Sequence, residues 1–230
     1  MNKVPVMTID GPSGSGKGTV SRAAARALGW ALLDSGALYR LVALAGRQAG
    51  VRLDNGPELA RLAQAADIGF GPGGSGEGLV WLNGADVTGA IRTEEAGNDA
   101  SRVAAIPLVR AALLERQRRF AVPPGLVADG RDMGTVVFPG AEVKIFLTAS
   151  AAERALRRHK QLKEKGVAAN LAALSLEIAE RDLRDSTRAA SPLVASADAV
   201  LLDTTGMSVD AVVERVLEVA RGRLSRGLSK

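Results

Sequence analysis

The residues best suited to chemistry lie near the start of this 230-residue chain. A short apolar run, Val4–Ile9, is typical of a buried parallel strand, and it leads into GPSGSGKGT at residues 11–19 and an alanine-rich helical stretch. Backbone N–H groups of such a glycine-rich turn can surround phosphate oxygens, and the following helix adds positive charge. The pattern G-x-x-x-x-G-K-[ST] is met from Gly11 to Lys17, but Gly18 replaces the metal-binding hydroxyl. We therefore expect a nucleoside triphosphate here, with Lys17 reaching its β- and γ-phosphates from an exposed loop.

Polar residues also follow two later apolar runs. Asp34-Ser35-Gly36 comes after Trp30–Leu33, at the strand end where ligands of doubly wound sheets gather. Arg40 lies about one helical turn further on and can face the same cleft; alternatively, it is a buried arginine paired with a carboxylate. Asp129 ends the run Leu126–Ala128 in the manner of a Walker B carboxylate. It could orient water on Mg²⁺, or it could cap a turn.

Charged residues recur in two further segments. Arg131 and Asp132 stand side by side in a turn with a glycine before and after them, where they could bind a ligand or form a surface pair. Arg181, Asp185 and Arg188 are spaced i, i+4, i+7, which places them on one helix stripe or its extension. The same spacing would also serve ion pairs within the helix.

An arginine-rich segment follows the apolar run at 143–147. Arg154, Arg157 and Arg158 crowd the helix expected there, and Gly166 separates it from a second helix. Such a helical hairpin is suited to act as a lid. The pattern does not decide which arginine reaches the nucleotide, although we favour Arg157 and Arg158. His159 is expected to be a solvated residue of this lid.

The composition narrows the chemistry. The chain has no cysteine and one histidine, which excludes disulfides, thiolate catalysis and sites with several histidines. Seven lysines leave 23 of the 30 basic residues as arginines, in a chain of net charge +5. This bias favours an anionic ligand, although most arginines would also suit solvated helix faces. No signal-peptide core or long apolar run is present, so we expect a cytoplasmic protein without a membrane span.

The elements that must position these residues alternate between strand and helix. Two further apolar runs, Val143–Leu147 and Ala199–Leu202, bring the expected strands to five. Apolar runs that alternate with helices predict an α/β fold with a parallel sheet. Ser150 and Ser208 precede two of the later helices as expected caps.

One stretch breaks this rhythm, between about residues 53 and 88. A short helix is followed by Ile68–Phe70, a glycine-rich turn at 71–78 that we expect to be mobile, and Leu79–Leu82. Asn83-Gly84 then gives a strong signal for a type I′ hairpin turn. We expect a small antiparallel insert, followed by a pair of helices at 93–104 and 107–119.

Four strings together resemble the bacterial cytidylate kinases, a family of P-loop nucleoside monophosphate kinases. They are the phosphate loop with its Lys-Gly-Thr ending, DSGALYR at 34–40, DGRDMGT at 129–135, and ERD at 180–182 with Asp185, Arg188 and Pro192-Leu193. The resemblance runs in order from Ile9 to about Asp203. It implies transfer of phosphate from ATP to CMP or dCMP with Mg²⁺, and a five-stranded parallel sheet flanked by helices. The insert would close over CMP and the lid over ATP.

The resemblance also implies roles for single residues. Arg131 would hold the acceptor phosphate, and Asp132 would accept a hydrogen bond from the cytosine amino group. Ser101 and Arg110, which alone would suit ordinary helix surface, would donate to the opposite base edge. Arg181 and Asp185 would hold the ribose, and Arg188 a phosphate. The resemblance implies that CMP is bound by Ser35, Arg40, Ser101, Arg110, Arg131, Asp132, Arg181, Asp185 and Arg188. It implies that ATP is bound by Gly11, Pro12, Ser13, Gly14, Ser15, Gly16, Lys17, Gly18 and Thr19. The implied catalytic residues are Lys17, Arg131, Arg188, Arg157 and Arg158, and Asp129 would contact the metal ion through water.

We therefore expect one kinase domain over residues 1–230. Its core would take about 1–50, 104–150 and 190–230, its NMP-binding insert about 51–103, and its lid about 151–189. We expect a monomer without a stable nucleic-acid partner, because aromatics that could stack bases make up 3% of the chain. The remaining alternatives are a kinase for UMP, AMP or a small alcohol, and a basic nucleic-acid-binding protein.

Overall fold

The computed structural model describes residues 4–71, 78–164 and 166–227. Its chain separates into two compact units. The first unit comprises residues 1–34 and 118–230, and the second comprises residues 35–117. No helix in the described ranges is long and apolar enough to cross a membrane.

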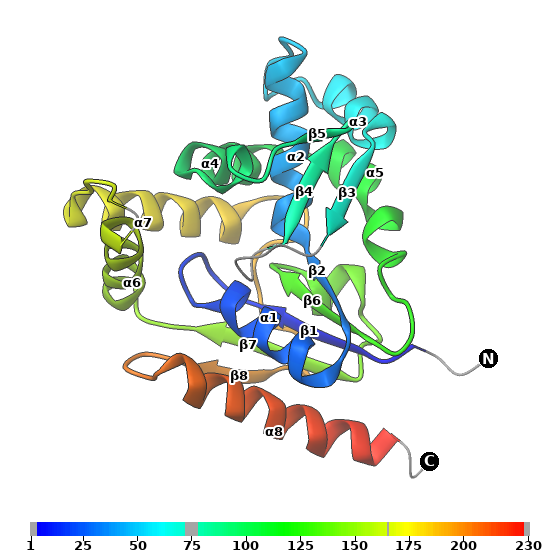
Figure 1. Cartoon of the computed structure of the whole chain (residues 1–230), viewed down its shortest axis with the longest axis vertical. Coiled ribbons are helices and arrows are strands. Elements are labelled where there is room, and N and C mark those ends of the chain that lie inside the picture. The colour runs from blue at the N-terminus through cyan, green and yellow to red at the C-terminus, as the bar shows by residue number, and fades with distance from the viewer. Residues whose placement is uncertain (1–3, 72–77, 165, 228–230) are drawn as a thin grey trace. The chain divides into compact units, whose positions relative to one another are not determined.

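The described residues of the first unit form a five-stranded parallel sheet, as the sequence predicts (Figure 1). Every residue of β1 and β6 is buried, which is why both strands are mainly apolar, with an aspartate only at or near the carboxyl end. Parallel pairing places the carboxyl ends of these strands at one edge, where the phosphate loop follows β1. The strands, in spatial order, are β2 (Ala31–Asp34), β6 (Leu126–Gly130), β1 (Val6–Asp10), β7 (Val143–Thr148) and β8 (Val200–Asp203).

Helices α1 (Lys17–Leu28) and α8 (Val209–Gly227) pack together against this sheet (Figure 1). Their apolar stripes meet strand residues in one core, which includes Ile9 of β1, Val20 of α1 and Val216 of α8. This packing explains the spacing of apolar residues along both helices. Their burial fixes α1, and with it the phosphate loop that leads into it, against the sheet.

The first unit also contains α6 (Ala151–Glu164), α7 (Leu171–Thr187) and a π-helical turn, η2 (Met133–Val137). The expected caps are confirmed. The Ser150 hydroxyl accepts a hydrogen bond from the Glu153 N–H at 3.2 Å, and the Ser208 hydroxyl accepts one from Ala211 at the same distance. Each satisfies an N–H group that the first helical turn leaves without a partner.

The described part of the second unit holds a three-stranded antiparallel sheet with strand order β3-β4-β5. Asn83 and Gly84 both have positive φ, at 51° and 80°, as a type I′ turn requires; the hairpin prediction is confirmed. The glycine-rich turn predicted at 71–78 lies, for residues 72–77, outside the described residues. The elements are α2 (Ser35–Gln48), α3 (Gly56–Ala65), β3 (Ile68–Gly71), β4 (Leu79–Leu82), β5 (Ala85–Asp86), the 3₁₀ turn η1 (Ala90–Arg92), α4 (Glu94–Val103) and α5 (Pro107–Arg118).

This unit is wider than the insert expected at 51–103. It includes α2, because Leu41 and Ala45 of that helix are buried in one core with Val80 of β4 and Ile91 of η1. Side-chain packing thus groups α2 with the antiparallel sheet, although α2 follows β2 directly in the chain. The roles of 51–103 as an NMP-binding insert and of 151–189 as a lid stay predictions.

Candidate nucleotide-binding site

The phosphate loop, residues 11–19, depends on glycine at three positions. Gly11, Gly14 and Gly16 have φ values of 148°, 76° and 90°, a region that residues with a side chain rarely adopt. A Cβ on Gly11 would also lie 1.9 Å from the carbonyl oxygen of Leu147 on β7. The loop therefore passes so close to the sheet edge that a side chain cannot fit there.

The Lys17 side chain turns back into this loop. Its Nζ donates to the Pro12 carbonyl at 2.8 Å, and Ser15 Oγ donates to the same oxygen at 3.0 Å. Lys17 is 6% exposed, so the expectation of an exposed lysine is wrong. Burial lowers the pKa of Lys17 to about 7; the positive charge of Arg131 adds to this effect and Asp129 opposes it. An anionic ligand beside the amine would favour its charged form again.

Asp129 lies at the end of β6, paired in register with Asp34 of β2. Its Oδ2 would be 3.5 Å from a Cβ on Gly18, which puts the carboxylate beside the phosphate loop as expected. Burial raises the pKa of Asp129 to about 6, Lys17 lowers it and Asp34 raises it further. Two carboxylates here fit a Mg²⁺ ion that keeps mainly phosphate and water ligands. The described residues contain no group of three or more acidic or histidine ligands.

Asp10, the last residue of β1, is a part of the site that the sequence analysis missed. Its carboxylate is 5% exposed and accepts hydrogen bonds from the Met133 and Gly134 N–H groups, both at 2.8 Å. Burial raises the pKa of Asp10 to about 7, against the lowering effect of these N–H groups. The signal in the sequence was an acidic residue at the end of a buried strand, just before the phosphate loop.

Asp10 holds the segment that carries Arg131 and Asp132. A Cβ on Gly134 would lie 2.8 Å from Thr8 Oγ1 and 3.4 Å from Asp10 Oδ2. Glycine at 134 is thus required for close approach to β1, and its φ is not in the left-handed region. The segment after β6 is consequently anchored to the strand that precedes the phosphate loop.

Arg131 and Asp132 are not a surface pair. Asp132 is buried, and Arg131 Nε donates to Asp185 Oδ2 of α7 at 2.9 Å. This contact also means that Asp185 serves more than ion pairs within its own helix. Arg188 follows the end of α7, is buried, and donates through Nε to the Ser191 carbonyl at 2.6 Å. The structure thus brings Arg131 of the β6 end together with Asp185 of α7.

The arginines of α6 divide into two groups. Arg154 donates to the Ser13 carbonyl at 3.0 Å, and Arg157 donates to the Ser15 carbonyl at 3.4 Å and to Thr204 Oγ1 at 3.0 Å. Both therefore contact the phosphate loop. Arg158 donates to Gln161 of its own helix.

The candidate residues of the second unit are largely buried. Ser101 is 5% exposed and Arg110 is 9% exposed, so ordinary helix surface is the wrong description for both. The Arg110 guanidinium lies 5.6 Å from the ring centroid of Tyr39, within cation–π range. Ser35 is also buried, whereas Arg40 is half-buried and forms no ion pair with a described residue. Tyr39 was missed, although it is the single tyrosine of the chain.

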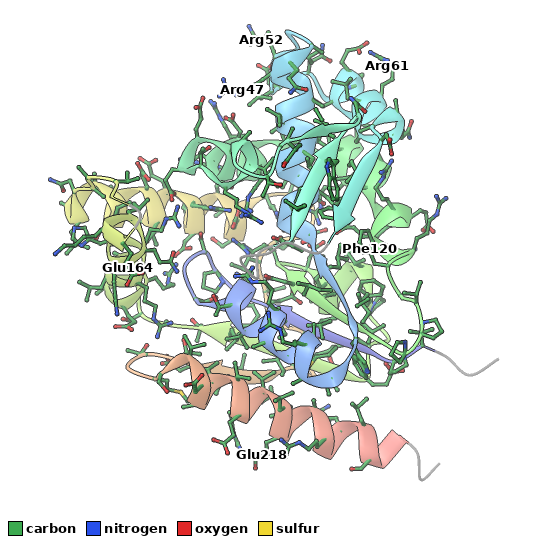
Figure 2. All side chains as sticks on the ribbon, in the orientation of Figure 1. Arg47, Arg52, Arg61, Phe120, Glu164 and Glu218 are labelled. Atoms are coloured by element: carbon green, nitrogen blue, oxygen red, sulfur yellow. The ribbon has the colours of Figure 1, made fainter. Side chains whose placement is uncertain are left out.

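Other arginines are solvent-exposed, as the alternative of solvated surfaces expects; Arg47 and Arg61 lie on α2 and α3, and Arg52 lies between these helices. Figure 2 labels three of them in the second unit, Arg47, Arg52 and Arg61. Each pairs with carboxylates of its own unit, respectively Asp99 and Glu95, Asp54, and Glu58. Position, rather than the arginine content, thus distinguishes the arginines of the site.

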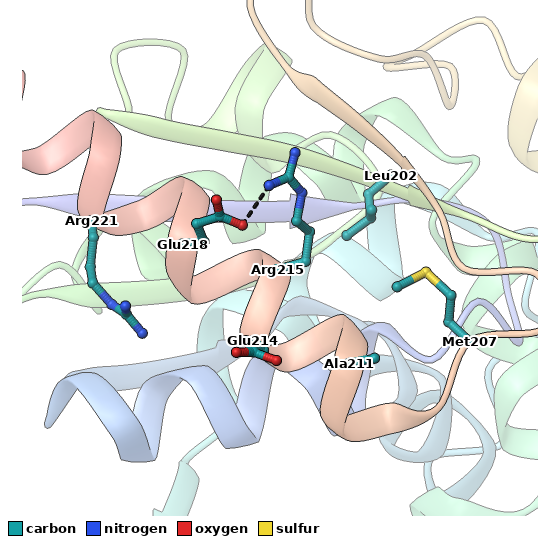
Figure 3. Close-up of a pocket in the computed structure, with 7 residues that line it drawn as sticks. All are labelled: Leu202, Met207, Ala211, Glu214, Arg215, Glu218 and Arg221. Carbon is teal, nitrogen blue, oxygen red and sulfur yellow. Dashed lines mark hydrogen bonds and ion pairs between the residues drawn. The ribbon is translucent and has the colours of Figure 1, made fainter.

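A pocket of about 350 Å³ lies away from these residues, on β8 and α8 (Figure 3). Arg215 and Glu218 form an ion pair at its wall, next to Leu202 and Met207. It contains none of the candidate residues, so cavity volume alone would misplace the site. Within the first unit, Lys17, Asp129 and Arg131 lie instead beyond or near the carboxyl ends of β1 and β6.

Comparison with known proteins agrees with this geometry. A family model described as cytidylate kinase matches residues 7–222. A cytidylate kinase of Stutzerimonas stutzeri is 59% identical over 219 residues, which cover 94% of this chain and 96% of that protein. Those of Shewanella denitrificans and a Marinomonas strain are 54% and 56% identical, over 97% of this chain and 99% of each protein. Because the matched range includes the phosphate loop, the β6 end and α7, and these relatives cover 94% or more of the chain, this chain belongs to the cytidylate kinase family.

Proposed function

We propose that this protein transfers the γ-phosphoryl group of ATP to CMP or dCMP, giving ADP and CDP or dCDP. The observation that carries the proposal is the arrangement at the sheet edge. A phosphate loop with a buried lysine lies at the same sheet edge as the end of β6. There Asp185 binds Arg131, and Asp10 binds the turn that follows Asp132. Family membership supports the choice of substrates.

On the donor side, the phosphate loop binds the phosphates of ATP. Its N–H groups and the start of α1 favour negative charge, and Lys17 interacts with the β- and γ-phosphates. Arg157, which already contacts the Ser15 carbonyl, and Arg158 are the arginines of the lid that we assign to ATP. Asp129 would hold Mg²⁺ through water, and the ion, when bound, neutralises charge on the phosphate oxygens.

On the acceptor side, Arg131 and Arg188 bind the phosphate of CMP, while Arg181 and Asp185 hold its ribose. Asp132 accepts a hydrogen bond from the cytosine amino group, and Ser101 and Arg110 donate to the opposite edge. All three of these residues are buried, and Arg110 also donates to the Ala104 carbonyl at 3.1 Å; their assignment to cytosine is supported by family membership. Ser35 and Arg40 complete the acceptor set.

The chemistry then requires little of the protein beyond alignment and charge neutralisation. A phosphate oxygen of CMP is already ionised near neutral pH, so no dedicated general base is needed. Lys17, Arg131 and Arg188 stabilise the negative charge of the transferring group. Closure of the lid at 151–189 over ATP and of the insert at 51–103 over CMP would exclude water. The monomeric state, the cytoplasmic location and the lack of a stable nucleic-acid partner stay predictions.

The test is ADP production measured with a panel of acceptors: CMP, dCMP, UMP, AMP and a small alcohol. CMP and dCMP should give the highest kcat/KM, and Lys17→Met should set the background. Highest efficiency with another acceptor would overturn the substrate assignment. Tight RNA binding without nucleotide turnover would instead favour a nucleic-acid-binding protein.

A further inference from the structure

Arg154 of α6 has a different environment from the other two arginines in its helix. It is 5% exposed, and its guanidinium donates hydrogen bonds to protein groups on several sides. Nε donates to the Ala149 carbonyl at 3.0 Å, and NH1 donates to the Ser13 carbonyl at 3.0 Å. The fork also binds both carboxylate oxygens of Asp182, at 3.0 and 2.6 Å. Arg154 thus connects the phosphate loop, the start of α6 and α7.

The contact with Ser13 constrains the peptide that Ser13 and Gly14 share. In a planar trans peptide the carbonyl and the N–H point in opposite directions. Because the carbonyl is directed toward Arg154, the Gly14 N–H must point away from α6. A Cβ on Gly14 would lie 3.1 Å from Arg154 Cβ and 3.4 Å from the Arg154 carbonyl oxygen. The first turn of α6 therefore lies directly against the loop and leaves this peptide little freedom to rotate.

Asp182 sets the orientation of the arginine. A bidentate pair between an arginine and a carboxylate has a defined plane as well as a charge. Asp182 occupies α7 three residues before Asp185, which holds Arg131. One face of α7 thus carries two acidic residues, each of which binds an arginine from another segment of the first unit.

We propose that Arg154 and Asp182 are positioning residues of the phosphate loop. Asp182 holds Arg154, and Arg154 holds the Ser13–Gly14 peptide with its N–H directed to the bound phosphates. Arg154 thereby acts on ATP through the loop and contacts no substrate atom. The inference rests on the proposed function, because the phosphates are taken to be those of ATP.

The test compares Asp182→Asn, Arg154→Lys and the double variant with the wild type. Asparagine keeps the shape of the side chain but loses the charge, and lysine keeps the charge but lacks the fork. The dissociation constants of ADP and of CMP are measured separately by calorimetry. Each single variant should raise Kd for ADP about five- to twentyfold, the range expected for one misplaced hydrogen bond. Kd for CMP should stay within about twofold, and the double variant should resemble the single ones.

Glu177→Gln is the matched control, because it removes one negative charge from an exposed position of the same helix. It should bind ADP as the wild type does. An unchanged Kd for ADP in both single variants would overturn the proposal. So would equal losses for ADP and CMP, which would indicate a displaced α7, or additive effects in the double variant. If Asp182→Asn does not fold, Arg154→Lys decides. A wild type that binds ADP but does not phosphorylate CMP would refute the proposed function and leave this test valid.

Discussion

Replacing Asp10 by asparagine should remove a pH dependence of folding stability that the wild type shows. Asp10 is buried at the end of β1, and burial raises its pKa from the ordinary 3.8 to about 7. Between these two values the native state keeps a proton that the unfolded state has released. The contribution of Asp10 to stability is therefore complete below about pH 4 and is lost as the pH rises through about 7.

The size of the effect follows from the shift. A difference of about three pKa units corresponds to about 4 kcal/mol over the full range. Between pH 5 and pH 8 the wild type should lose about 2.5 kcal/mol from this group, because part of the range lies below pH 5. The asparagine side chain of the Asp10→Asn variant cannot titrate, so the variant should not show this loss of stability between pH 5 and pH 8. The loss of one acceptor for the Met133 or Gly134 N–H lowers stability by a constant amount and leaves the slope unaffected.

The assay is equilibrium urea unfolding of both proteins at pH 5, 6.5 and 8 without nucleotide. The quantity of interest is the stability difference between the proteins as a function of pH, since other titrating groups occur in both. Asp210→Asn, exposed in the first turn of α8, serves as the control and should keep the slope of the wild type. Parallel pH profiles for the wild type and Asp10→Asn would refute the argument that burial controls this carboxyl group.

Four further outcomes are expected. In the Asp132→Asn variant the side-chain amide can rotate to present a donor, so the CMP-to-UMP ratio of kcat/KM should fall below the roughly five- to 150-fold preference expected of the wild type. An unchanged ratio would remove Asp132 from base recognition. Lys17→Met should lower kcat at least about a hundredfold while circular dichroism stays native, and near wild-type turnover would contradict the phosphate-loop assignment. Gly11→Ala should lower the free energy of unfolding, measured in urea, by about 2–4 kcal/mol because of the clash with Leu147. The control Gly29→Ala should lower it by about 1 kcal/mol, because a Cβ there meets no atom within 4 Å. Hydrogen exchange across 151–187 should slow when ADP and CMP are both bound, and equal exchange rates would mean a static hairpin.

Several features of this protein could be predicted from the sequence because their causes are local. The central strands β1 and β6 are short, mainly apolar segments that are buried throughout, so their pattern does not depend on which strand lies next to which. The Asn83-Gly84 turn and the serine caps at 150 and 208 depend on backbone preferences and hydrogen bonds within four residues. The phosphate loop belongs to the same class, since its glycines and Lys17 are consecutive in the chain.

The partners of the charged residues were decided by the tertiary structure. Arg131 and Asp185 are 54 residues apart in sequence. Asp10 accepts hydrogen bonds from the N–H groups of Met133 and Gly134, which lie 123 and 124 positions further along the chain. No local pattern encodes such pairs, because they exist only after the order β2-β6-β1-β7-β8 places the β6 end beside β1. The same applies to Lys17, whose pKa is lowered by burial and by the charge of Arg131, against the opposing effect of Asp129. The residue types of the site are thus written in the chain, while their charge states and contacts arise from segments that meet only in the folded sheet.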